Sequence, residues 1–345
     1  MRKTENNNTG ASVQPSSDAV ASTYKSADTE EWFDIVFNRP IGYQWALLFR
    51  RLGVHPNTVT VFSMILGAAA GVMFSFDADT SCGLLLNIIG VLLLVWANFY
   101  DSADGQLARL TGQKTQLGRI LDGAGADVWY ISIYVCLALR LFDKPIPFIS
   151  SLGTEFSLFG LELPIPQQWG WWGFVLAASC GLLCHTPQCR LSDYYRNIHL
   201  FFLNAKNGSE FDRAAAQRKK YEEMPWKGNY VNKIFQWFYK NYTAAQEKST
   251  PRFQAFWQKV QETYGNDIPQ TLRDEFRRRS LPLMKYTNIL TFNTRAFALY
   301  IACLIDLPWI YLLFELIVLT VICRYMHWRH EHFCRELLAS LNNKD

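Results

Sequence analysis

Residues 87–127 read NIIGVLLLVWANFYDSADGQLARLTGQKTQLGRILDGAGAD, and they decide how the rest of the chain is interpreted. An apolar run suited to the interior of a bilayer ends at Tyr100. Four aspartates follow it, namely Asp101, Asp104, Asp122 and Asp127. An uncompensated carboxylate at the edge of a bilayer is costly. The stretch therefore indicates a membrane helix that ends in acidic side chains, and something must offset their charge.

The composition agrees with a membrane protein. Half of the 345 residues are hydrophobic and only 19% are charged, yet the mean hydropathy is −0.03. Apolar spans that alternate with polar segments explain both values. The formal net charge of +4 is too small to suggest nucleic acid as a partner.

Six segments approach the ~20 mostly apolar residues that a helix needs to cross the hydrocarbon core. They run from Val59 to Phe76, Cys82 to Tyr100, Leu117 to Leu141, Trp169 to Cys184, Ile289 to Ile305 and Pro308 to Cys323. We therefore expect an all-α integral membrane protein with six transmembrane helices. Loops 77–81 and 306–307 contain no basic residue. The positive-inside rule then predicts an inner (cytoplasmic) membrane with both termini and the aspartates facing the cytoplasm.

The other segments predict how the chain is divided. Residues 1–30 are polar and suit a disordered tail. Residues 31–56 mix aromatic, aliphatic and basic side chains, which favours an amphipathic helix in the membrane interface. The remaining predicted parts are spans one to four at 57–189 with the motif at 101–127, a cytoplasmic insert at 190–287, spans five and six at 288–326, and a cytoplasmic tail at 327–345.

The predicted insert is rich in basic and aromatic residues. Such a composition suits helices that rest on an anionic leaflet, and it suits equally a solvated helical hairpin with an ordinary core. Both interpretations stay open. Charge also occurs within the predicted spans. Arg295 lies near enough to a span end to reach water along its own side chain, whereas Glu315 stands alone in the sixth span.

The motif has a helical spacing. At about 100° per residue, Asp101, Asp104, Gly105 and Ala108 fall within roughly one third of a helix circumference. Carboxylates bind hard divalent cations, and missing side chains let a bulky ligand approach the backbone. Arg109, at the edge of this face, supplies a cation for phosphate.

The next span supplies a partner for this face. Gly118 and Asp122 are four residues apart and share one face of the third span. Because spans two and three are antiparallel neighbours, Asp122 can face Asp101 and Asp104. Coordination of Mg²⁺ or Mn²⁺, which would also hold phosphates, would offset the cost of the carboxylates. A polar loop with incidental acids explains any one aspartate better, but it explains the whole set poorly.

The stretch DSADGQLARLTGQKTQLGRILD closely resembles the signature of the CDP-alcohol phosphatidyltransferase (CDP-alcohol phosphotransferase) family. That signature is DxxDGxxAR, followed after seven or eight residues by GxxxDxxxD. The matching positions are Asp101, Asp104, Gly105, Ala108, Arg109, Gly118 and Asp122. The expected layout, an interfacial helix and then six spans, is also similar to that of the family.

The resemblance implies a phospholipid-synthesis enzyme, a phosphotransferase for substituted phosphate groups. It would move a phosphoalcohol group from a CDP-linked lipid donor to the hydroxyl of a polar acceptor and release CMP. It implies metal binding by Asp101, Asp104 and Asp122, and nucleotide binding by Gly105, Ala108, Arg109 and Gly118. Membrane lipids and a second copy of the chain are the implied partners.

The chain departs from the signature at its last aspartate. The expected position holds Ala126, and Asp127 follows. In a regular helix Asp127 would lie about 140° from the face of Asp122. A π-bulge within the run GAGA at 123–126 would return Asp127 to that face, as a further metal ligand and as the general base. Alternatively, Asp127 points elsewhere and the protein is an inactive scaffold homologue.

The substrates are less constrained by the sequence. We expect CDP-diacylglycerol as donor and inositol or inositol phosphate as acceptor, with Arg190 and Arg196 as candidate ligands of an acceptor phosphate. Ordinary basic residues at a cytoplasmic helix end explain either arginine at least as well. Glycerol phosphate, serine, and a CDP-choline or CDP-ethanolamine donor used on a lipid hydroxyl stay open. A cation transporter is a further alternative, but it would need acids spread through several spans.

Overall fold

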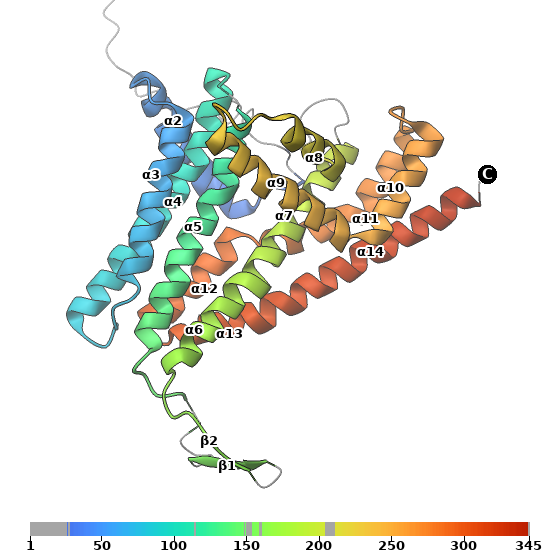
Figure 1. Cartoon of the computed structure of the whole chain (residues 1–345). Coiled ribbons are helices and arrows are strands. Elements are labelled where there is room, and N and C mark those ends of the chain that lie inside the picture. The colour runs from blue at the N-terminus through green and yellow to red at the C-terminus, as the bar shows by residue number, and fades with distance from the viewer. Residues whose placement is uncertain are drawn as a thin grey trace, which may run out of the picture.

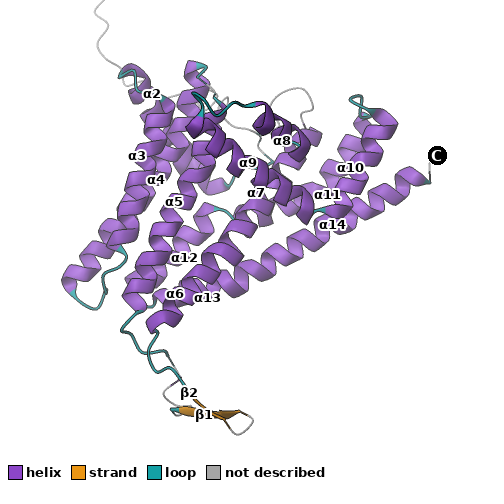
Figure 2. Cartoon of the chain, in the orientation of Figure 1, coloured by secondary structure: helices purple, strands orange, loops and turns teal. Residues whose placement is uncertain are grey.

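The computed structural model describes residue 26 and residues 28–113, 115–147, 149, 154–158, 161–203 and 211–343. Helices make up most of the described chain, as expected (Figure 2). Most of the predicted disordered tail, residues 1–30, lies outside the described residues. The first helices are η1 (Asp34–Asn38), α2 (Arg39–Arg51), α3 (Pro56–Met73), α4 (Ser81–Thr111) and α5 (Gln116–Leu141).

The second half of the chain holds two long rods that each contain a π-helical segment. One consists of α6 (Gly170–Ser179), η3 (Cys180–His185) and α7 (Thr186–Leu203), and the other of α13 (Pro308–Leu313), η4 (Phe314–Leu319) and α14 (Thr320–Asn342). The remaining helices are α8 (Ala214–Glu223), α9 (Tyr230–Ser249), α10 (Pro251–Tyr264), α11 (Gln270–Ile289) and α12 (Phe292–Leu304). The predicted limits of the insert and of the tail therefore fall inside or next to helices rather than in linkers.

Among the described residues, four stretches of helix are long and apolar enough to cross a membrane, which indicates a membrane-embedded protein. They are Pro56–Met73, Ser81–Thr111, Ile120–Leu141 and Pro308–Asn342. The predicted fourth span, which corresponds to α6 and η3, contains three tryptophans and is followed directly by His185, so the mean hydropathy over a membrane-crossing length there is low. The predicted fifth span corresponds to α12, whose 13 residues extend about 20 Å of the ~30 Å that a crossing needs.

A small β-hairpin departs from the all-α expectation. Strand β1 (Glu155–Leu158) pairs antiparallel with β2 (Leu161–Pro164) in the connection between α5 and α6. It lies at the end of the bundle farthest from α2 (Figure 1). The sequences EFSL and LELP alternate polar and apolar residues, which is the period of a strand rather than of a helix.

Close contact between α3, α4 and α5 depends on glycine. A Cβ atom added at Gly67 of α3 would lie 2.0 Å from Cδ1 of Trp129 on α5, and one added at Gly71 would lie 2.5 Å from Oγ of Ser132. Glycines let membrane helices approach until their backbones nearly touch. The resulting bundle brings the aspartate-bearing end of α4 beside α5.

A second core lies at the same end of the molecule as α2 and joins part of the predicted insert to the long rods. Aromatic side chains of α10 and α11 pack there against α7 and α14; they include Phe253, Phe256, Trp257 and Phe276, and Phe202 of α7 lies among them. This half of the insert therefore has an ordinary aromatic core.

The two charged residues of the predicted fifth and sixth spans pair with each other. Both Arg295 of α12 and Glu315 of η4 are 0% exposed, and the two form an ion pair. Tyr134 donates a hydrogen bond to Glu315 over 2.6 Å, and Nδ1 of His185 lies 3.4 Å from the same carboxylate. The expectation that Arg295 reaches water along its own side chain was wrong, because its partner Glu315 comes from a neighbouring helix that sequence spacing does not reveal.

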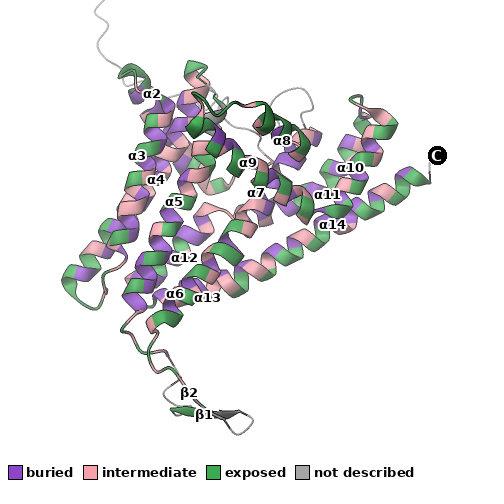
Figure 3. Cartoon of the chain, in the orientation of Figure 1, coloured by how far each residue is buried: buried purple, intermediate pink, exposed green. Residues whose placement is uncertain are grey.

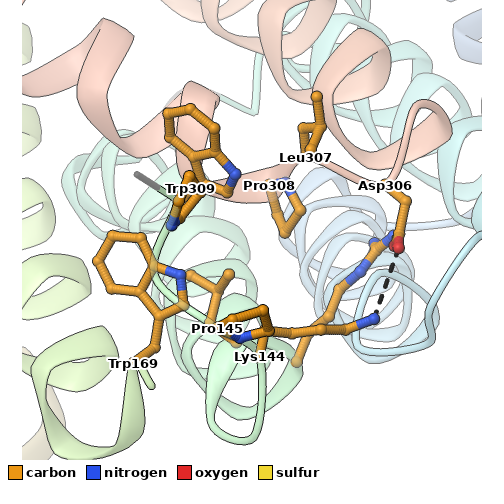
Figure 4. A pocket seen from close by; sticks show the side chains of 10 residues that line it. Lys144, Pro145, Trp169, Asp306, Leu307, Pro308 and Trp309 are labelled. Atoms are coloured by element: carbon orange, nitrogen blue, oxygen red, sulfur yellow. Dashed lines mark hydrogen bonds and ion pairs between the residues drawn. The ribbon is translucent and has the colours of Figure 1, made fainter. Parts of the chain in front are cut away.

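The end of the bundle nearest the β-hairpin carries a separate charge cluster. Arg140, which is buried, pairs with Asp306 over 2.5 Å, and Lys144 lies 3.1 Å from Asp77. The cluster borders a cavity of about 190 Å³ that Trp169 and Trp309 also line (Figure 4). These contacts tie the α3–α4 and α12–α13 connections to the end of α5.

We expect Gly67→Ala to destabilise the bundle, because the added Cβ would overlap the Trp129 ring. Overpacking of this kind costs about 1–3 kcal/mol. The measurement is thermal unfolding of the purified protein in detergent. Gly123→Ala is the matched control, since a Cβ at Gly123 meets nothing within 4 Å. A Gly67→Ala protein as stable as the Gly123→Ala protein would show that the contact does not limit helix packing.

Candidate metal and nucleotide site

Three carboxylates from two helices meet at one point. Asp101 and Asp104 of α4 and Asp122 of α5 each offer an oxygen atom, and these atoms lie within 4.8 Å of one another. We call these residues the acidic trio. The structure thus brings together the residues that the sequence placed on facing sides of two neighbouring helices.

The turn between α4 and α5 sets this convergence. Gly112 closes α4 in the left-handed conformation, with φ of 70°, and Thr115 caps α5 by accepting a hydrogen bond from the Gly118 backbone N–H over 2.9 Å. A glycine at this position avoids the strain that a Cβ would bring. Asp104 precedes Gly112 by eight residues and Asp122 follows it by ten, so both carboxylates lie at a similar height above the turn.

The surroundings of the trio fit a divalent cation. Oδ1 of Asp101 is buried and has no hydrogen-bond partner within the described part of the chain. Asp104 accepts a hydrogen bond from the Thr60 hydroxyl of α3. Buried carboxylates need a compensating positive charge, and oxygen donors of this kind are those that Mg²⁺ and Mn²⁺ prefer. The trio is therefore suited to holding one such ion.

Arg109 lies beside the trio, and some of its N–H donors have no acceptor among the described residues. Its guanidinium folds back over Gly105, since a Cβ added there would lie 3.5 Å from Nη1 of Arg109. Nε and Nη2 of Arg109 are buried, and no described residue accepts a hydrogen bond from them. An arginine with unsatisfied donors is suited to a phosphate oxygen. Ala108 is half-buried on the same helix, so little side-chain bulk separates this face from a ligand.

Asp127 lies apart from the trio. Helix α5 is α-helical from Gln116 to Leu141, so the predicted π-bulge at 123–126 was wrong. Gly125 is the residue that approaches Asp101, with a built Cβ 3.8 Å from its Oδ1. Asp127 instead lies where it interacts electrostatically with His185 of η3. The run GAGA permits a bulge, but nothing in the packing of α5 requires one.

The two candidate arginines of α7 each have a buried Nε atom from which no described residue accepts a hydrogen bond. Six residues separate them, which places them about 120° apart around the helix. Arg196 donates a hydrogen bond to the Asn288 side chain over 3.0 Å at the end of α11. The backbone oxygen of Arg190 accepts one from Gln246 of α9 over 3.3 Å.

Sequence reasoning missed two contributors to the site. Thr60 belongs to PNTVT at the start of α3, and only its contact with Asp104 reveals its part. Arg39 interacts electrostatically with both Asp101 and Arg109, while its guanidinium pairs with Glu30 over 3.1 Å. A basic residue before Pro40 gave no sign of this, because more than sixty positions separate it from the motif.

Arg39 ends an N-terminal strap, residues 28–39, that connects the insert to the site. At one end, Asp28 accepts hydrogen bonds from Arg277 of α11 over 2.8 and 3.0 Å. In the middle, Glu31 and Asp34 both accept from Asn293 at the start of α12. At the other end, the backbone oxygen of Arg39 accepts from Gln106 of α4 over 3.1 Å.

The comparisons with known proteins agree with this geometry. The fold and the site together describe a membrane-embedded helical protein in which three carboxylates that could hold a metal ion lie beside an arginine. Residues 53–178 match the model of the CDP-alcohol phosphatidyltransferase family, which is a family of transferases. The matched stretch contains the whole trio and Arg109, so the resemblance found in the sequence is confirmed. Neither the curated proteins nor the solved structures provided a match.

We expect Asp122→Asn to weaken Mn²⁺ binding by at least about tenfold, because the trio loses one charged oxygen ligand. Electron paramagnetic resonance of Mn²⁺ titrated into the purified protein measures this. Asp127→Asn is the matched control on the same helix and should bind Mn²⁺ like the wild type. Equal loss in both variants would mean that Asp127 is a ligand and that α5 changes its register.

The strap should make stability depend on pH through His199. Burial lowers the pKa of His199 below 6.5 by more than the neighbouring Asp28 carboxylate raises it, and the nearby Arg277 lowers it further. The folded state therefore holds the proton less tightly than the unfolded state. The stability that neutral His199 contributes is complete above pH 6.5 and is lost as the pH falls below it.

The comparison is between the wild type and His199→Gln. Its readout is the melting temperature in detergent at about pH 7.5 and about pH 5.5. We expect the advantage of the wild type to shrink at the lower pH. An equal difference at both pH values would show that His199 does not titrate in this range.

Proposed function

We propose that the protein transfers a phosphatidyl group from CDP-diacylglycerol to the hydroxyl of a polar alcohol and releases CMP. Inositol or inositol phosphate is the acceptor that we favour. The acidic trio carries the proposal: three carboxylate oxygens within 4.8 Å of one another, inside the stretch that matches the family. Phosphatidyl transfer from a CDP-alcohol is the activity that this family supports.

Different residues of the site would bind different parts of the CDP-linked donor. The trio would hold Mg²⁺ or Mn²⁺, which supplies positive charge against the diphosphate when it is bound. Gly105 and Ala108 would leave the backbone open to the nucleotide, and Arg109 would donate to a phosphate oxygen. Gly118 would help to shape the nucleotide site through its close packing against Asn57 of α3. Fixed donors aimed at developing charge are the main contribution that a protein makes to such a displacement.

The proton of the attacking hydroxyl needs an acceptor. We propose Asp127 for this role of general base, from the position beside His185 in which the regular helix α5 holds it. The alternative is an inactive scaffold homologue. Ala126 at the signature position and the place of Asp127 beside His185 favour that alternative.

The proposal includes the arrangement in the membrane. We propose six spans, with α6–η3 and α12 as the fourth and fifth, and with α2 in the interface on the cytoplasmic side together with both termini. The pairing of Arg295 with Glu315 supports a buried place for α12 despite its charge. Exposed Trp32, Phe37 and Leu48 support an interfacial place for η1 and α2. A lipid donor could then enter sideways while a polar acceptor arrives from water.

Release of CMP from labelled CDP-diacylglycerol, with Mg²⁺ or Mn²⁺ and a panel of acceptors, tests the proposal. We expect turnover with inositol or inositol phosphate. Asp104→Asn should reduce it by roughly 10²-fold or more, because the donor phosphates lose their counter-charge. Asp127→Asn should bind Mn²⁺ normally and lose turnover if it is the base.

The other outcomes separate the alternatives. Full activity of Asp127→Asn would remove the general-base assignment while leaving the reaction in place. Turnover with CDP-choline or CDP-ethanolamine and a lipid hydroxyl would show that the donor carries the polar alcohol and that the lipid is the acceptor. A protein that binds Mn²⁺ but releases no CMP with any donor or acceptor would be the scaffold homologue. Arg196→Gln and Arg190→Gln, with inositol phosphate against inositol, would show whether either arginine binds an acceptor phosphate.

A further inference from the structure

Helix α9 has its polar and apolar sides reversed. Its buried side chains include Lys233, Gln236, Thr243 and Gln246. Its exposed side chains include five large apolar or aromatic ones, between 45% and 62% exposed, namely Tyr230, Val231, Ile234, Trp237 and Phe238. A surface helix of a soluble protein buries its apolar stripe and exposes its polar one. The outer side of α9 is therefore better suited to an apolar environment than to water.

The five exposed residues form one continuous face. At about 100° per residue they occupy roughly one third of the circumference. We call them the outer face of α9. They all lie in the first half of the helix, whereas the exposed positions of the second half include Asn241 and Lys248. The outer face is therefore a compact apolar patch rather than a scatter of single residues.

The inner side of α9 is fixed by hydrogen bonds, so the helix cannot simply roll over to bury the outer face. Gln236 donates to the Gln217 side chain of α8 over 2.9 Å. Tyr242 donates to Asp193 of α7 over 3.2 Å, and Gln246 donates to the Arg190 backbone oxygen over 3.3 Å. Turning the helix would exchange these contacts for buried and unpaired polar groups.

The outer face continues the apolar surface of the membrane bundle. Helix α9 contacts α5 and α7, and it crosses them near the end of the bundle opposite the β-hairpin (Figure 1). Exposed residues run along α9 and along α5 below it (Figure 3). On α5 the exposed apolar residues Val128, Ile131 and Val135 belong to a candidate membrane span. The lipid that covers α5 is thus the nearest apolar medium to α9.

The charge around α9 complements an anionic surface. Residues 211–249 contain eight basic and four acidic residues, so their net charge of +4 equals that of the whole chain. Exposed basic side chains of this segment include Lys220 and Lys227, and Nζ of Lys240 lies 3.8 Å from the Tyr221 ring of α8. Aromatic rings with lysines at their edge are typical of the headgroup region.

We propose that the outer face of α9 inserts into the headgroup region of the anionic bilayer that the bundle crosses. The insert then has two different halves. Its α10–α11 half packs into the aromatic core, and its α9 half lies on lipid across α5 and α7. This inference depends on the exposure and charge of α9 and not on the reaction assigned to the acidic trio.

Site-specific photocrosslinking of the full-length protein tests this inference. Benzoylphenylalanine replaces Ile234 on the outer face, or Asn232 as the matched control. Asn232 is exposed on the same helix, about 160° away from Ile234. Each protein is reconstituted into phosphatidylcholine vesicles with roughly one quarter phosphatidylglycerol, and lipid adducts are measured by mass spectrometry.

We expect lipid adducts at position 234 to exceed those at position 232 by about fivefold or more, and to decrease when phosphatidylglycerol is left out. Equal yields at the two positions would overturn the proposal. A crosslinked dimer as the main product at position 234 would also overturn it, since a second copy of the chain would then cover the outer face.

A second measurement covers the case in which the probe disturbs the helix. Hydrogen exchange of residues 226–240 is compared between detergent and the same vesicles. Vesicles should protect this segment in the wild type and in Asn232→Asp, but not in the double variant Val231→Asp with Ile234→Asp. Equal protection in the double variant would contradict membrane contact through the outer face.

Discussion

The repulsion between three carboxylates at one point is the constraint on which the rest of the structure depends. Two such charges 4.8 Å apart repel by roughly 3 kcal/mol at an effective dielectric constant of ~20. The bundle must therefore hold α4 and α5 together against this force. Gly67 and Gly71 let α3 press closely on α5, and Thr60 of the same helix donates to Asp104. The same helix that closes the bundle thus also helps to stabilise the trio.

The local pattern of the sequence predicted much of the site. Asp101, Asp104 and Asp122 are fixed by helical spacing and by a short turn, and both can be read along a single chain. The longest apolar helices were found for the same reason, since length and hydropathy are local properties. Contacts between distant segments were not predictable. The partner of Arg295 and the approach of Arg39 to the motif depend on how helices pack, which spacing does not encode.

The predictions that were wrong also depended on how helices pack against one another. The π-bulge at 123–126 was inferred from a family signature, but α5 packs as a regular helix and presents Gly125 to Asp101 instead. The π-helical segments of the long rods lie where charge is buried: His185 ends η3, and Glu315 lies within η4. A π turn shifts the side chains that follow it around the helix. Its position is decided by the partner across the interface rather than by the residues in the turn.

The ion pair between Arg295 and Glu315 has a consequence for how the chain enters the membrane during synthesis. An unpaired arginine costs up to about 2.5–3.5 kcal/mol in an inserting helix, and less near a helix end such as the position of Arg295 in α12. Its neutralising partner follows 20 residues later, beyond the short turn at 305–307. With α12 as the proposed fifth span, the translocon would release it into lipid only together with the start of the last rod, as one neutral hairpin. The order of translation thus becomes part of the folding pathway of the last two predicted spans.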